Sequence, residues 1–414
     1  MSCQSDIPPT NKIKGSRLIA NALAENGVEY IFEIPGAGVA IILDEVATKD
    51  AMHHITFRHE QGAALAAEAY ARITGKPGVC MATSGPGATN LITGIANAYC
   101  DSVPMVAITG QGPQFKLKGD YPTRQKSFQE VDIVSVCRPI TKAAMQIKNV
   151  NDIGRTINMA FKIAMEGRKG PVLIDIPSDI ITSEIEPRKY QEIPVWIDEI
   201  KPATDFNKGK VENILNNSKQ PVLYVGGGAQ RASSEVIKFI DKTKIPVVHT
   251  LMGKGIVPDD HPLCFGLQGL AGSRIANWML NNADVVLALG ARFADKAVGN
   301  DYSFTGKLIH VDIDPWEFDK MVVVDERILA KVEDIMPVLD NELNIRPETG
   351  EWLSVINEKA AEYTWDREYE DFPLLAKFFE YLSRHSKGAI ITTDVGQHQM
   401  WANQLYRVTE TVDT

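Results

Sequence analysis

The sequence lacks the features that mark several classes of protein. Its 414 residues contain no run of about 18 apolar residues, so we expect no transmembrane helix and no membrane partner. The polar N-terminus has no apolar signal core, which favours a cytoplasmic protein. Lysine and arginine are outnumbered by acids, and the net charge of −10 argues against nucleic acid as a partner.

Cysteine is scarce and scattered. Because no two cysteines have the spacing of a disulfide framework or a zinc motif, the sequence predicts neither, and it gives no metal-binding residues. The five cysteines are Cys3, Cys80, Cys100, Cys137 and Cys264.

Apolar strands that alternate with helical segments are the main structural signal. In residues 10–182, buried strands are predicted in YIFEIPGAG, GVCMATSGPGATN, PMVAITGQ and GPVLIDIPSDI. Such strands, separated by helices, indicate an α/β fold with a doubly wound parallel sheet and helices on both faces.

A second and a third α/β region follow. Residues 182–205 are charged and contain proline, so we interpret them as a linker. Residues 206–340 repeat the strand–helix pattern, with strands in PVLYVGGGA, IPVVHTLMG, DVVLALGAR and KLIHVDIDP. Residues 372–414 predict a helix, a strand and the start of another helix, and we expect them to begin a third domain that this chain does not complete.

Several predicted strand ends have the composition of a ligand site. Ligands of open α/β sheets collect at the carboxyl ends of the strands, where this chain has Pro35-Gly36 and Gly85-Pro86-Gly87. Glu60 follows another strand end and begins an alanine-rich helix. From the residues alone, glycine turns are explained as well by backbone geometry, and Glu60 by its favourable position at a helix N-terminus.

Longer motifs in order carry a more specific signal. The segments RHEQGA, AYARITGKPGV, TSGPGATNLITGIANAY, DSVPMVAITGQ, FQEVDIV and TDVGQHQMWANQ resemble those of thiamine diphosphate (ThDP) enzymes, above all the acetolactate synthase large subunit. The resemblance extends from about residue 14 to residue 404. It implies a ThDP pyrimidine-binding domain over residues 10–182, a central Rossmann-like domain over 206–340 and a truncated start of a diphosphate-binding domain over 372–414.

The resemblance also implies roles for individual residues of the first domain. Glu60 matches the glutamate that hydrogen-bonds the cofactor's aminopyrimidine and favours its reactive tautomer. Gln129 and Lys142 match residues near the reacting centre and the substrate channel, although Lys142 could equally be a solvated surface charge. The further cofactor-binding residues implied here are Pro35, Gly36, Gly85 and Asn90.

In the central domain the resemblance makes FAD a possible second cofactor. The chain departs from the family at Ala271, Ala294 and Lys296, and related ThDP enzymes keep this fold without a flavin, so both alternatives stay open. The residues that match the FAD contacts are Arg168, Gly227, Gly269, Gly272, Gly290, Arg292, Asp312 and Asp314.

The predicted activity follows from the same likeness. We expect an acetolactate-synthase-like, ThDP-dependent decarboxylation and carboligation of a pyruvate-like 2-keto acid, in a homodimer or with a complementing chain. The chain has no Gly-Asp-Gly motif for magnesium and the diphosphate, so this expectation includes an incomplete or inactive isolated chain. A longer, basic loop with Lys116, Lys118, Arg124 and Lys126 leaves the substrate open. The alternative is a non-catalytic protein that binds a nucleotide or a partner.

Overall fold

The computed structural model describes residues 12–119, 122–186, 206–297, 304–363 and 372–409. The chain forms two compact units, Met1–Glu199 and Ile200–Thr414, which we describe separately. Most of the predicted linker, residues 187–205, lies outside the described residues, as do residues 10 and 11 of the first predicted domain and 410–414 of the third. None of the helices that the structure describes combines the length and hydropathy needed to cross a membrane.

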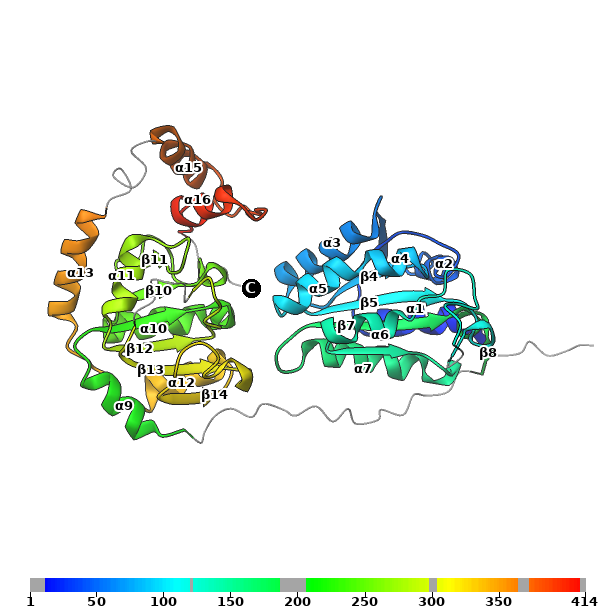
Figure 1. Ribbon diagram of the computed structural model, residues 1–414, viewed down its shortest axis with the longest axis horizontal. Coiled ribbons are helices and arrows are strands. Elements are labelled where there is room, and N and C mark those ends of the chain that lie inside the picture. Colours follow the sequence, from blue (N-terminus) through cyan, green and yellow to red (C-terminus); the bar gives the residue numbers. More distant parts are fainter. Residues whose placement is uncertain (1–11, 120–121, 187–205, 298–303, 364–371, 410–414) are drawn as a thin grey trace, which may run out of the picture. The chain divides into compact units, whose positions relative to one another are not determined.

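The N-terminal unit is built on a parallel sheet of six strands with helices on both faces (Figure 1). The strand order is β3-β2-β4-β5-β7-β6. This confirms the predicted doubly wound α/β fold. The strands are β2 (Tyr30–Glu33), β3 (His53–Thr56), β4 (Gly78–Ala82), β5 (Met105–Gln111), β6 (Ala143–Gln146) and β7 (Pro171–Pro177), beside an antiparallel pair of β1 (Ile13–Lys14) and β8 (Glu184–Ile185).

Alternate residues of the central strands pack on opposite faces of this sheet. Val79 and Met81 of β4 join a core formed with α1 and α7, whereas Cys80 and Ala82 join a second core formed with α3 and α5. The helices are α1 (Gly15–Glu25), α2 (Ala40–Val46), α3 (Glu60–Thr74), α4 (Pro86–Asn90), α5 (Ile92–Cys100), α6 (Ile133–Cys137), α7 (Ile153–Met165) and α8 (Ser178–Thr182).

The C-terminal unit repeats the architecture with a second six-stranded parallel sheet, in the order β11-β10-β9-β12-β13-β14. Helices α10 and α12 cover one face, and α11 and α13 cover the other. Its strands are β9 (Pro221–Val225), β10 (Val247–His249), β11 (Cys264–Leu267), β12 (Val285–Leu289), β13 (Lys307–Asp312) and β14 (Glu326–Leu329), and its helices are α9 (Lys208–Asn216), α10 (Ser233–Thr243), α11 (Arg274–Asn282), α12 (Val332–Asn341), α13 (Gly350–Glu362), α15 (Pro373–His385) and α16 (Gln397–Leu405).

The last described segment differs from its prediction. Helices α15 and α16 form, but the strand expected between them is absent: residues 389–394 adopt no regular structure. Ile390 is 66% exposed, and the described residues provide no strand beside it. Since a strand is stabilised by hydrogen bonds to a neighbour, an apolar segment without one does not form it.

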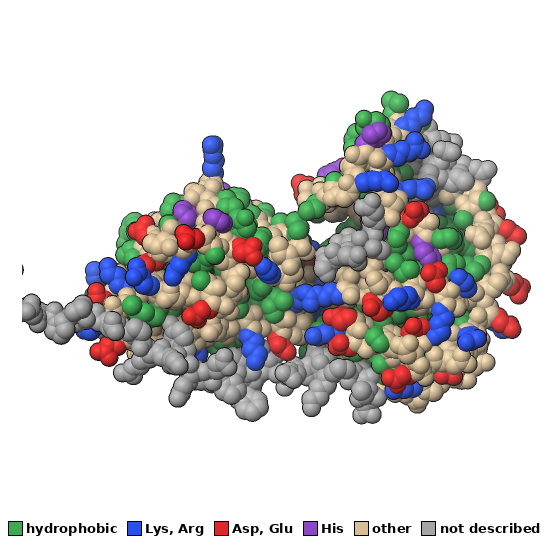
Figure 2. Space-filling view, turned by 180° about the vertical axis from the view of Figure 1, so that it is seen from behind, with side chains coloured by type: hydrophobic (Ala, Val, Ile, Leu, Met, Phe, Trp, Pro, Cys, Tyr) green, Lys and Arg blue, Asp and Glu red, His purple; other side chains and the backbone are tan. Residues whose placement is uncertain are grey.

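Charged side chains of both signs are interspersed over both units on the face that Figure 2 shows. Neither unit presents a broad basic field on that face, as expected from the acidic composition.

Candidate functional site

The first candidate site lies at the carboxyl edge of the N-terminal sheet. After β2 the chain adds β3 on one side and later β4 on the other, so the loops after β2 and β4 diverge at this edge. Such a reversal of strand order is where α/β sheets bind ligands. Pro35 and Gly36 follow β2, Gly85 follows β4, and Glu60 follows β3. The structure therefore brings these four predicted residues to one edge.

Helix α3 fixes the position of Glu60. His59 is the N-cap, and its Nδ1 accepts a hydrogen bond of 3.1 Å from the backbone N–H of Gln61. Glu60 is the first residue of the helix, where the helix dipole favours a carboxylate. The buried face of α3 is rich in alanine and lies so close to β4 that a Cβ on Gly78 would come within 1.9 Å of the Ala67 carbonyl oxygen. Small residues thus hold the middle of the helix against the sheet, which fixes the direction of its first turn.

The Glu60 carboxylate is held by one side chain. Asn90 Nδ2 donates a hydrogen bond of 2.9 Å to Oε2. Oε1 faces the backbone of Gly87, where an added Cβ would lie 3.3 Å away. No described residue forms a hydrogen bond with Oε1, so this oxygen remains available as an acceptor.

The loops after β2 and β4 interlock beside Glu60. A Cβ on Gly36 would come within 2.6 Å of Thr83 Cβ, so only glycine allows this approach. Two residues later, the Gly38 N–H donates to Thr83 Oγ1 over 3.1 Å. The loops that flank the candidate site therefore have a fixed spacing.

Gln129 reaches the same edge through a strained backbone. Its φ of 54° is in the left-handed region, and an added Cβ on Gly85 would lie 2.7 Å from its Cβ and its carbonyl oxygen. The Gly85 turn and the Gln129 turn are therefore in direct contact.

Two anchors hold the segment around Gln129. The Glu130 carboxylate accepts backbone N–H bonds from Lys118, Lys126 and Ser127. Desolvation raises the pKa of Glu130, but these donors outweigh it and the pKa lies below its usual value. On the other side, Gln111 Nε2 donates to the Val131 carbonyl over 2.9 Å. In the described part of the predicted basic loop, Lys118 and Lys126 are thus both held close to Glu130.

Behind Gln111 lies a buried acid that the sequence analysis overlooked. Asp175 on β7 is 1% exposed and accepts hydrogen bonds from Thr109, Gln111 and Gln146. Burial raises its pKa to about 6, although these donors oppose the shift. The visible signal was an aspartate inside the apolar strand GPVLIDIP. Asp175 links β5, β6 and β7 and thereby supports the anchor of the Gln129 segment.

Lys142 and Arg168 lie at the opposite edge of the sheet from Glu60. Each precedes a parallel strand, β6 or β7, so each is at the amino edge. Lys142 is half-buried, which excludes the solvated surface charge considered as its alternative. Its Nζ donates to the carbonyls of Ile163 and Glu166 at the end of α7, and burial lowers its pKa to about 8. Arg168 Nε donates to Ser102 Oγ over 2.8 Å.

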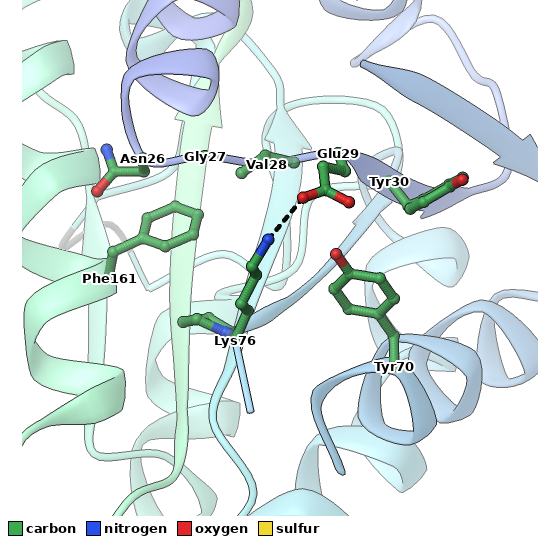
Figure 3. A pocket seen from close by; sticks show the side chains of 9 residues that line it. Asn26, Gly27, Val28, Glu29, Tyr30, Tyr70, Lys76 and Phe161 are labelled. Carbon is green, nitrogen blue, oxygen red and sulfur yellow. Dashed lines mark hydrogen bonds and ion pairs between the residues drawn. The ribbon is translucent and has the colours of Figure 1, made fainter. Parts of the chain in front are cut away.

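A surface hollow at that same amino edge is shown in Figure 3. It is lined by residues of the turn before β2 and by Tyr70 and Lys76, with a Lys76–Glu29 ion pair of 2.5 Å across it. The hydrogen bond from Lys76 lowers the pKa of Glu29. This hollow contains none of the predicted site residues.

In the C-terminal unit, the corresponding strand reversal lies between β9 and β12. Gly227 belongs to the turn after β9 and Gly290 to the turn after β12. An added Cβ on Gly290, whose φ is 58°, would lie 2.5 Å from the Cα of Gly228. The glycines let two backbone turns pack on each other.

Gly269 and Gly272 form a tight turn after β11. The φ of Gly269 is 118°, and the Gly272 N–H donates to the Gly269 carbonyl over 2.8 Å. Asn277 closes the turn, because its amide bonds both the N–H and the carbonyl of Gly269 at 2.9 Å.

The two predicted acids at the end of β13 bind their own backbone. Asp312 Oδ1 accepts from the Asp314 N–H at 2.9 Å, and Asp314 Oδ1 accepts from the Trp316 N–H at 3.0 Å. Arg292 follows β12 at the same edge. The structure thus groups the predicted FAD residues of this unit on neighbouring strand ends, while Arg168 belongs to the other unit.

Comparison of the sequence with known proteins identifies the family to which the chain belongs. Residues 13–136 match the family described as thiamine pyrophosphate enzyme, N-terminal TPP binding domain, and residues 209–339 match thiamine pyrophosphate enzyme, central domain. The chain is 37% identical over 410 residues to acetolactate synthase isozyme 1 large subunit of Escherichia coli, covering 95% of this chain and 70% of the relative. The chain belongs to the ThDP enzymes of the acetolactate synthase large-subunit family.

Other members of the family are equally similar. Acetolactate synthase large subunit of Lactococcus lactis is 38% identical over 400 residues, which cover 95% of this chain and 68% of the relative. The chloroplastic acetolactate synthase of Arabidopsis thaliana is 38% identical over 423 residues, covering 97% of this chain and 61% of the relative. The chain thus spans 61% to 70% of the length of these relatives. The family supports ThDP as the cofactor.

Proposed function

We propose that the carboxyl edge of the N-terminal unit holds the aminopyrimidine of ThDP, with Glu60 facing the ring. The observation that carries this is the Glu60 carboxylate, which Asn90 holds through Oε2 while Oε1 is left as an acceptor beside glycine. When bound, ThDP supplies the nucleophilic carbon for decarboxylation and carboligation of 2-keto acids.

The chain's own residues would position the ring and hold one proton. Glu60 Oε1 would share a proton with a ring nitrogen, and Asn90 would keep the carboxylate from rotating away. The lack of side chains at Gly36 and Gly87 lets Thr83 pack between the two loops, which fixes the backbone beside Glu60. The Gln129 segment would border the substrate.

We further propose the reaction of an acetolactate-synthase-like enzyme on a pyruvate-like 2-keto acid, in a homodimer or with a complementing chain. Since the sequence has no Gly-Asp-Gly motif, we assign no residue to magnesium. No observation on the described residues favours the non-catalytic alternative.

Calorimetry with ThDP and Mg²⁺ tests the cofactor site. Wild type should bind, and Glu60→Gln should weaken binding by roughly 100-fold, because a hydrogen bond to a charged group is replaced by a neutral one. Lys76→Met, at the opposite edge, is the matched control and should bind as wild type does. Absence of wild-type binding at millimolar ThDP would contradict the proposal, as would equal affinity of Glu60→Gln. Acetolactate formation from pyruvate then tests the reaction, and sedimentation tests the dimer.

The proposal of FAD as a second cofactor rests on the family resemblance alone. The glycines and acids of the C-terminal edge already have backbone partners that explain them. A flavin absorption band in the purified protein would establish FAD, and a colourless protein that takes up no added FAD would reject it.

A further inference from the structure

We propose that His249, Asp259 and Cys264 form a binding site for a divalent transition metal, with zinc as the preferred ion. His249 ends β10, Cys264 begins the neighbouring β11, and Asp259 lies in the crossover between them. One ligand atom from each residue lies within 4.8 Å of the others. The cysteine spacing could not reveal this set, because its ligands are of three different types.

The strongest evidence is the imidazole of His249. The residue is 2% exposed, and its Nδ1 lies 2.9 Å from the Thr250 carbonyl oxygen. A carbonyl only accepts hydrogen bonds, so Nδ1 carries a ring proton, and in the neutral imidazole Nε2 then presents a lone pair. Nε2 is buried and has no hydrogen-bond partner among the described residues. Leaving such an atom unpartnered is costly.

The atom that Nε2 faces is another acceptor. Asp259 Oδ1 lies 3.7 Å from Nε2, which is too long for a hydrogen bond. In the neutral imidazole, the lone pairs of Nε2 and Oδ1 therefore face each other across this distance, which a metal ion would bridge. A tetrahedral zinc ion separates a nitrogen and an oxygen ligand by roughly 3.3 Å, as its bond lengths require. The observed separation thus needs only a small contraction.

The remaining contacts of Asp259 leave Oδ1 for the metal. Lys254 Nζ and the Val408 N–H each lie 2.7 Å from the other oxygen, Oδ2. Both contacts are made by Oδ2, so they leave Oδ1 facing His249. They also join the crossover to the segment after α16.

Cys264 decides which metal the site prefers. The thiolate is the form of cysteine that binds a metal, so the thiol proton of Cys264 leaves as the metal binds. One sulfur, one imidazole nitrogen and one carboxylate oxygen suit Zn²⁺, whereas Mg²⁺ and Ca²⁺ prefer oxygen ligands alone. Water would complete the tetrahedron.

The nearby ammonium of Lys254 opposes a second cation and gives the proposal a distinctive consequence. Removing this charge should strengthen metal binding, although Lys254 is not a ligand. A cluster held together only by the Lys254–Asp259 ion pair would show no such gain.

Titration of the intact protein with Co²⁺, followed by competition with Zn²⁺, tests the site. Wild type should develop a thiolate-to-cobalt charge-transfer band that Zn²⁺ abolishes. Cys264→Ser should lose the band and bind Zn²⁺ on the order of 100-fold more weakly. Cys100→Ser, in the other unit, is the matched control and should keep the band. Circular dichroism of each variant checks that it is folded.

Two variants extend the test. Asp259→Asn should weaken Zn²⁺ binding while Cys264 keeps its place, and Lys254→Met should tighten it by about tenfold, as expected for loss of a nearby like charge. A wild-type protein without the band overturns the proposal, and so does a band that survives in Cys264→Ser. Equal zinc affinities of Lys254→Met and wild type would overturn the arrangement around Asp259.

Discussion

The two sheets of this protein share a fold but use the polar residues at their carboxyl edges differently. In the N-terminal unit, Glu60 accepts one hydrogen bond from Asn90 and keeps a second oxygen available. In the C-terminal unit, Asp312 and Asp314 accept from the backbone of the turn that they occupy. Glycine turns surround both sets. The difference shows that glycine content alone does not identify a ligand site; the two edges are separated by whether an acid is held by a side chain from another helix or binds the backbone of its own turn.

The largest expected effect concerns the glycine packing of the C-terminal edge. Gly290→Ala should lower the free energy of unfolding by roughly 4 kcal/mol, because it combines a left-handed backbone with a clash against the backbone of Gly228. Denaturation followed by tryptophan fluorescence measures this, since five of the six tryptophans lie in this unit and the sixth is Trp196. Gly350→Ala, where a Cβ meets nothing within 4 Å, is the matched control. Equal stabilities of the two variants would contradict the packing explanation.

The buried acid behind the N-terminal edge should make stability depend on pH. The pKa of Asp175 is raised to about 6 in the folded protein, so its stabilising contribution is present below pH 4 and is lost as pH rises through 6. Relative to Asp175→Asn, wild type should lose about 3 kcal/mol over this interval. Native-state hydrogen exchange of β5 and β7 peptides at several pH values measures the difference. A pH-independent difference would show that burial does not perturb this carboxyl.

Lys142 tests whether the amino edge of the N-terminal sheet contributes to stability and not to cofactor binding. Lys142→Met should lower the free energy of unfolding by about 1–2 kcal/mol, because the carbonyls of Ile163 and Glu166 lose their donor. ThDP affinity should not change, since Lys142 lies at the amino edge. Hydrogen exchange of α7 and calorimetry together separate the two results. Reduced ThDP affinity in a fully folded Lys142→Met protein would contradict this separation of the two edges.

Asn90 tests how strongly the Glu60 carboxylate depends on its support. Asn90→Ala should weaken ThDP binding by about tenfold, because one hydrogen bond to a charged group is lost while Glu60 remains. Calorimetry is again the measurement, and Asp312→Asn in the other unit should leave the affinity unchanged. If Asp312→Asn proved as damaging as Asn90→Ala, the two edges would not differ as described.

The smallest effect is expected at the hollow of the amino edge. Lys76→Met removes an ion pair whose side chains are 55% and 50% exposed, and such pairs contribute little in water. Neither the denaturation midpoint nor ThDP affinity should change measurably. A clear loss of affinity would mean that this hollow takes part in cofactor binding.

Errors in the predicted secondary structure are concentrated at the edges of the sheets. The central strands β4, β5, β7, β9 and β12 are buried throughout and are mainly apolar in the sequence. The edge strands β6, β11 and β14 were not predicted. An edge strand has a neighbour on one side only and is less buried, so its sequence is less apolar than that of a central strand. This affected the predicted site. Because β6 was not predicted, nothing in the sequence showed that Lys142, which precedes it, lies at the amino edge.

The sequence by itself determined the fold class, the series of α/β units and the family, because central strands and long motifs are local patterns. It also brought Glu60, Pro35, Gly36 and Gly85 to one edge, since residues that follow parallel strands share an edge. Only the tertiary structure decided which polar atoms at those edges are already used. It also placed Asp259 beside His249 and Cys264. Hydrogen-bond partners depend on distances between segments that are remote in sequence, and no local pattern encodes those distances.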